Sequence, residues 1–146
     1  MRMRNYLPCT ALALVACGGD WLTGPGTPLE LTHESLKGSW VQVLVVTSRV
    51  GNPSTARRFE SSTDEGEIIE FDGSGGVQHS RYGWDVVYTS PNYTISGDTL
   101  TMEFSYVAEV STTRLVLTLG GISRDFDGDG DQEPAVQAVT YQRGKD

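Results

Sequence analysis

The amino-acid sequence predicts an all-β domain, in which an antiparallel meander of about seven or eight strands closes or nearly closes into a barrel. The first observation is the strict alternation of apolar and polar residues over residues 99–107, because a half-buried sheet requires a period of two. The second is the recurrence of turn signals at short intervals, with almost no helical pattern. The third is composition, since 38% of the 146 residues are apolar and 9% aromatic, enough for one packed core.

Residues 1–16 have the pattern of an export signal. Arg2 and Arg4 form a positive beginning, and the apolar run over residues 7–16 is shorter than the about 20 residues that span a bilayer. The run ends in Leu14-Val15-Ala16-Cys17, which resembles the lipobox of bacterial lipoproteins. The resemblance implies that Cys17 becomes the first mature residue and carries acyl chains such as palmitate, which anchor the protein in the bacterial cell envelope. The alternative is an ordinary signal peptide that merely contains a cysteine.

Charge and cysteine content narrow the classes of partner. The formal charge of the whole chain is -8, and loss of the leader makes it -10. This acidic balance excludes a basic nucleic-acid footprint. Because an anionic membrane surface repels an acidic protein, we expect the lipid rather than charge to hold the protein at the membrane. Cys9 lies in the leader and Cys17 is modified, so the mature domain has no disulfide and no cysteine nucleophile. Gly18 after the cysteine indicates the outer membrane by the proteobacterial sorting rule, on either its periplasmic or its surface face.

The mature chain divides into a tether and one domain. Residues 17–30 carry the lipidated cysteine and a stretch rich in glycine and proline, which predicts a flexible tether. Residues 31–146 form the barrel domain, which we expect to be monomeric. Residues 29–37 predict a short helical turn, with Thr32 and Ser35 as its caps.

Strands are expected from residue 40 onward. The long polar connection over residues 49–64 is interpreted as a mobile loop at one barrel end. Turn signals at residues 72–76, 90–92 and 97–98 separate the other segments. The predicted strands are residues 40–50, 67–71, 77–82, 84–89, 93–96, 99–107, 112–119 and 136–142.

The interior of such a barrel holds either packed side chains or one small molecule. The residues predicted to point inward are large enough to fill a small barrel, yet an apolar cavity remains an alternative. They are Leu44, Val46, Trp84, Val86, Tyr88, Ile95, Leu100, Met102, Phe104, Tyr106, Leu115, Leu117 and Val139.

Three segments resemble bacterial lipocalin-like lipoproteins. Gly38-Ser39-Trp40 has the Gly-x-Trp pattern with which lipocalin-type first strands open, residues 93–102 are similar to the hairpin at mid-domain, and Thr140-Tyr141-Gln142-Arg143 is a similar ending. The resemblance covers roughly residues 36–143. It implies a lipocalin-like barrel in which Arg143 packs over Trp40 at the closed end, a contact worth about 0.5–2 kcal/mol.

An acidic segment over residues 124–135 is the strongest chemical signal. It resembles the calcium loops of FG-GAP and VCBS-type repeats, with Glu133 in place of the last aspartate, and alternate carboxylates in a tight loop converge on one point. Calcium prefers six to eight oxygen ligands, and Gly130 allows the sharp turn. A solvated acidic turn or a different metal are the alternatives. The predicted metal ligands of a structural calcium ion are Asp125, Asp127, Asp129, Asp131 and Glu133.

No arrangement of residues predicts an active site. His33 and His79 are interpreted as ordinary core or surface histidines, and no phosphate-binding loop, HExxH or GxSxG motif occurs. We therefore expect a binding protein rather than an enzyme, with a small apolar ligand or a surface protein of the envelope as its partner. The alternative is a structural or stress-related lipoprotein with a filled barrel and no discrete ligand.

Overall fold

The computed structural model describes residues 26–61, 66–81, 84–90 and 92–144, with side chains left out for residues 81 and 84–90. Most of the described chain is in strands, and the strand pairs are antiparallel. The elements are β1 (Pro28–Leu29), α1 (His33–Leu36), β2 (Gly38–Arg49), β3 (Asn52–Glu60), β4 (Glu67–Phe71), β5 (Val77–Arg81), β6 (Trp84–Ser90), β7 (Thr94–Ser96), β8 (Thr99–Thr101), β9 (Ser105–Ser111), β10 (Arg114–Arg124) and β11 (Glu133–Arg143).

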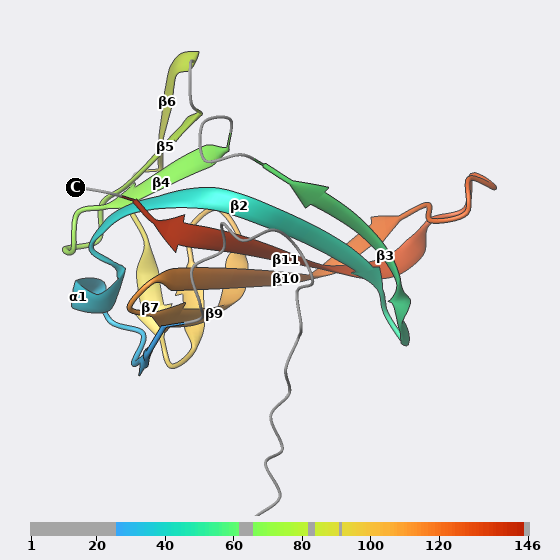
Figure 1. The fold of residues 1–146 in the computed structure, drawn as a ribbon, viewed down its shortest axis with the longest axis horizontal. Helices are drawn as coiled ribbons and strands as arrows, with labels where there is room; N and C mark the ends of the chain where they lie inside the picture. The colour runs from blue at the N-terminus through green and yellow to red at the C-terminus, as the bar shows by residue number, and fades with distance from the viewer. Residues whose placement is uncertain (1–25, 62–65, 82–83, 91, 145–146) are drawn as a thin grey trace, which may run out of the picture.

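The strands form one curled sheet in the order β6-β5-β4-β2-β11-β10-β9-β8-β7, with β1 added to β9 and β3 to β2 (Figure 1). The first long strand, β2, pairs with β4 on one edge and with the last strand, β11, on the other. Pairing of the first and last strands is typical of an up-and-down barrel. The path ends at β6 on one side and at β7 on the other, so the barrel opens between these strands. The predicted all-β, barrel-like class is confirmed.

The connection predicted as a mobile loop over residues 49–64 is instead largely a strand, and this prediction was wrong. β3 turns back at Gly51, whose φ of 80° favours glycine, and pairs with the outer half of β2 from Arg49↔Asn52 to Leu44↔Glu60. Polar composition suggested a loop, but an exposed edge strand is also polar, because only one of its edges is paired and its side chains face water.

The continuous strand predicted over residues 99–107 was also wrong. β8 ends at Thr101 and β9 begins at Ser105, and Met102 N–H donates to the Phe104 carbonyl in the connection between them. The hairpin places the Phe104 side chain outside, where it is 53% exposed, although it was predicted to point inward.

A β-bulge at Val43 sets which face of β2 points inward. Gln42 pairs with Tyr141 and Leu44 with Thr140, so β2 carries one residue more than β11 at this point. At the same place β2 exchanges β4 for β3 as its other neighbour, and Ser61 closes the junction by donating from N–H to the Val43 carbonyl. An inserted residue inverts the alternation of every side chain that follows it.

The core lies at the α1 end of the sheet, where the expected helical turn is confirmed. Thr32 caps α1, with reciprocal hydrogen bonds between Thr32 and Ser35 that form a capping box. Leu36 follows into the core and is fully buried. The residues of the main cluster are Leu36, Trp40, Ile69, Phe71, Val77, Tyr93, Leu100, Ala108, Val110, Leu115, Leu117 and Tyr141.

Arg143 packs over Trp40, as the family resemblance implies. Its guanidinium carbon lies 4.1 Å from the centroid of the indole ring, and the Trp40 Nε1–H donates to the Leu36 carbonyl at 2.7 Å. The guanidinium also donates to three carbonyls, those of Ser35, Lys37 and Thr112. One side chain therefore ties α1, the start of β2 and the β9–β10 turn together.

Replacement of Arg143 tests this contact. We expect Arg143→Met to lower the free energy of unfolding by about 2–3 kcal/mol, because charge-assisted hydrogen bonds and a cation–π contact are lost from a partly exposed site. Arg143→Lys should lose roughly half as much, since an ammonium cannot reach all three carbonyls. Urea denaturation measures both, with Lys37→Met as the control because Lys37 contributes only its backbone. An unchanged unfolding midpoint in Arg143→Met would contradict the role of this residue.

Candidate functional site

The inner face of the curled sheet holds a trough made of two adjoining pockets. The inner pocket, of about 200 Å³, lies where β4 and β5 face β9 across the curl. The outer pocket, of about 270 Å³, lies under β3. Val45 and Gln137 line both pockets, so they adjoin along β2 and β11.

The inner pocket combines an apolar floor with polar walls. On one wall the Nδ1 atom of His79 lies 2.8 Å from a Glu67 carboxylate oxygen. Burial, with the negative charge of Glu67, raises the pKa of Tyr106, and it raises the pKa of Tyr141 well above its ordinary value. Both phenols therefore stay neutral in the physiological range. The described lining residues are Gln42, Val45, Glu67, Ile69, His79, Met102, Tyr106, Leu117, Gln137, Val139 and Tyr141.

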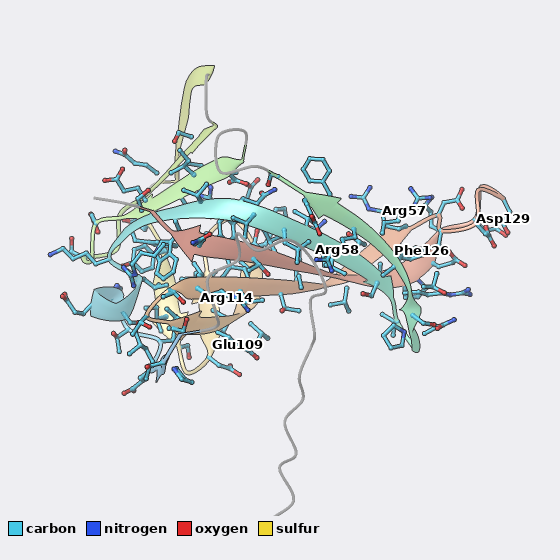
Figure 2. All side chains as sticks on the ribbon, in the orientation of Figure 1. Arg57, Arg58, Glu109, Arg114, Phe126 and Asp129 are labelled. Carbon is cyan, nitrogen blue, oxygen red and sulfur yellow. The ribbon has the colours of Figure 1, made fainter. Side chains whose placement is uncertain are left out.

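The outer pocket is lined by cationic and aromatic side chains. Phe59 is 62% exposed although it is a large apolar residue. Arg57 reaches from β3 to the β10–β11 hairpin, where it donates to the Asp125 carbonyl at 2.8 Å (Figure 2). The described lining residues are Val45, Thr47, Arg57, Arg58, Phe59, Arg124 and Gln137.

The bulge at Val43 explains why the predicted inward set differs from the observed one. Val45 and Thr47 line the trough, so Leu44 and Val46, which alternate with them, point to the other face of β2; Leu44 is nevertheless buried, with 7% of its surface exposed. Ile95, Met102, Tyr106 and Val139 pack against the core, and Leu100, Leu115 and Leu117 are buried in it, as predicted. The predictions for Trp84, Val86 and Tyr88 fall on side chains outside the described part of the chain.

The acidic segment forms the tip of the β10–β11 hairpin, which projects beyond the sheet (Figure 1). Carboxylate oxygens of Asp125, Asp127 and Asp129 lie within 4.8 Å of one another. Gly128 and Gly130 have φ values of 82° and 92°, and their N–H groups donate to the two oxygens of Asp125. These bonds lower the pKa of Asp125, and the charge of Arg57 contributes.

The other two predicted ligands are placed differently. Glu133 accepts from the Phe126 N–H and forms an ion pair with Arg49 at 3.1 Å, so its carboxylate turns toward β2. Asp131 N–H donates to the Asp129 carboxylate, and its own carboxylate does not join the group of three in the described structure. Of the five predicted ligands, Asp125, Asp127 and Asp129 are the ones whose carboxylate oxygens could bind one cation together. Backbone carbonyls or water would fill the other coordination positions.

Both histidines have aromatic or acidic partners. His33 Nδ1 lies 2.9 Å from the Tyr93 hydroxyl, and His79 belongs to the inner pocket. The contact between His79 and Glu67 could not be predicted from the sequence. It arises because β4 and β5 pair in a register that makes these two residues diagonal neighbours. The sequence reasoning missed Arg57 and Phe59 because their polar segment was interpreted as a loop, and residues 57–59 carry no apolar–polar alternation that would have indicated a strand.

The predictions for the leader lie outside the described residues, and so do Cys17 and most of the tether. In the described part of the chain no helix combines the length and hydrophobicity needed to cross a membrane. Comparisons of the chain with family models, with curated proteins and with solved structures give no match.

The hairpin tip should respond to acid. The lowered pKa of Asp125 means that its contribution to stability is complete above the ordinary value of 3.8 and is lost as the pH falls through the lowered value. We expect the amide protons of Gly128 and Gly130 to shift in a transition with its midpoint below 3.8, followed by NMR from about pH 5 to about pH 2. Asp125→Asn should remove the transition. A midpoint at or above the ordinary value would contradict the hydrogen bonds described here.

Proposed function

We propose that the chain is a lipid-anchored lipoprotein of the bacterial envelope, lipocalin-like in form, whose barrel-like domain binds a small molecule with an apolar body in the trough. The observation that carries the proposal is the pair of adjoining pockets on the inner face. Each is below the about 300 Å³ of the smallest common ligand sites, but the two together fall within the usual range. The anchor at Cys17 rests on the lipobox resemblance.

Apolar side chains between polar ends support binding rather than catalysis. Val45, Val139 and Leu117 form an apolar row across the floor of the trough, and none carries a reactive group. A ligand there would exchange water for apolar contacts, while Gln42 and Gln137 offer hydrogen bonds that fix its orientation. The filled-barrel alternative, a structural lipoprotein without a ligand, has less support because the trough is open.

Filling the junction of the two pockets tests the proposal. We expect Val45→Trp to weaken binding of an uncharged apolar fluorophore, N-phenyl-1-naphthylamine, at least about tenfold, because an indole would occupy the space where the pockets meet. Val46→Trp is the matched control, since it adds the same side chain on the other face of β2. Fluorescence titration measures both variants. Equal affinities for the two variants, or no binding to the unaltered chain, would contradict ligand binding in the trough.

We further propose that the three aspartates of the β10–β11 tip hold a structural calcium ion. Their carboxylate oxygens gather within 4.8 Å of one another, and mutual repulsion makes that arrangement costly in the absence of a cation. Calcium bound there would stabilise the hairpin that carries Arg124 and receives Arg57.

Thermal and chemical unfolding with and without calcium test the ion. With about 10 mM calcium and a dissociation constant of about 1 mM, mass action predicts a stabilisation of about 1.4 kcal/mol. The double variant Asp127→Asn with Asp129→Asn should lose this response. Glu109→Gln, on β9 away from the tip, should keep it (Figure 2). Coincident curves with calcium and with chelator would exclude a structural ion at this loop.

A further inference from the structure

We propose that the trough selects an amphiphilic anion, with its carboxylate or phosphate head at Arg57 and Arg124 and its apolar chain along Val45 toward Leu117. This inference rests on the proposed binding function and specifies the chemistry of the ligand. It follows from the way in which charge and apolar surface are distributed along the trough.

The outer pocket concentrates positive charge in an acidic protein. The chain carries a formal charge of -8, yet three arginines line this one pocket, Arg57 and Arg58 from β3 and Arg124 from the end of β10. Guanidinium groups recognise carboxylates and phosphates with paired N–H donors, and the apolar wall beside them strengthens such contacts.

Two of these arginines are available to a ligand. Arg58 is paired with Glu60 at 2.8 Å, and nearby Arg49 is paired with Glu133. Among the described residues neither Arg57 nor Arg124 forms an ion pair. The contact of Arg57 with the hairpin is to a backbone carbonyl, which occupies one of its N–H groups and leaves the others.

Asp125 is the residue of the acidic loop that Arg57 contacts, through its backbone carbonyl. The charge of Arg57 contributes to the lowered pKa of Asp125, but both carboxylate oxygens accept from Gly128 and Gly130 N–H groups of the hairpin tip. Figure 2 shows Asp129 at the far end of that tip, whereas Arg57 lies back on β3. Among the described residues no carboxylate of the acidic loop lies within ion-pair distance of Arg57 or Arg124.

The apolar surface begins directly beside the arginines. Phe59 lies opposite Val45 in the β2–β3 ladder, and its exposed ring can cover the first part of an apolar chain. From Val45 the floor of the inner pocket continues across the sheet to Val139 and Leu117, and along β2 to Gln42. The path from Thr47 to Gln42 along β2 is roughly 13 Å, because the bulge adds no length and the paired span on β11, from Gln137 to Tyr141, is four residues; this suits a chain of medium length.

The inner end of the trough decides the orientation. Glu67 stands there with His79, and a second anion beside this carboxylate would be repelled. An uncharged chain end meets Ile69 and Leu117 at that end instead. A head group that is anionic is thus favoured at the outer end and disfavoured at the inner end.

Titration calorimetry of the full chain with four probes of the same chain length tests the proposal: decanoate, decyl phosphate, decanol and decylamine. We expect at least one of the two anions to bind at least about tenfold more tightly than decanol or decylamine. The difference between decanoate and decyl phosphate identifies the head group. Arg57→Gln with Arg124→Gln should remove the preference for anions while decanol binding stays unchanged. Lys37→Gln, which removes one exposed cation at the α1 end, is the control for loss of positive charge away from the trough and should keep the preference.

Each contrary result has a distinct meaning. If decanol binds as tightly as the anions, and Val45→Trp weakens all four probes, the head-group inference fails and the proposed binding function stands. If no probe binds, both fail. If vesicles of phosphatidylglycerol bind through Arg57 and Arg124 but monomeric anions do not, the arginines form a membrane-facing patch and the inference is overturned.

Discussion

The double pairing of β2 is the constraint on which the rest of this structure depends. One edge of β2 pairs with β11 over almost its whole length, and the other edge pairs first with β4 and then with β3. It therefore joins the meander β4–β6 to the meander β7–β11, which otherwise have no common strand. Arg143 secures the inner end of this arrangement by holding Trp40 and the carbonyls around it.

The trough is a direct consequence of the way in which β2 changes partners. The extra residue at Val43 bends the strand and lets β3 continue the sheet after β4 has ended. It also moves Val45 and Thr47 to the inner face. The space beneath β3 is then open to solvent and bordered by Arg57, so the same local irregularity supplies the cavity and the charge at its entrance.

The hairpin of β10 and β11 connects the trough to the acidic tip. Arg57 from β3 meets the Asp125 carbonyl, and Glu133 at the base of the hairpin meets Arg49 of β2. Both contacts cross between elements that are distant in the sequence. The proposed calcium ion would act on the same hairpin from its other end, and by ordering the tip it would help to position Arg124.

Much of this protein was determined by the sequence alone. Local chemistry predicted the capped turn at Thr32, the strand Glu67–Phe71, the half-buried rows at Leu115 and Leu117, and the all-β class, because alternation and turn residues act between neighbours in the chain. Resemblance predicted Arg143 over Trp40. Only the tertiary structure decided that residues 52–60 form the strand β3 and that the alternation of inward and outward side chains along β2 changes at Val43. Both features depend on how distant segments pair, as Gln42 pairs with Tyr141. No local sequence pattern shows which residue of a strand will be left unpaired.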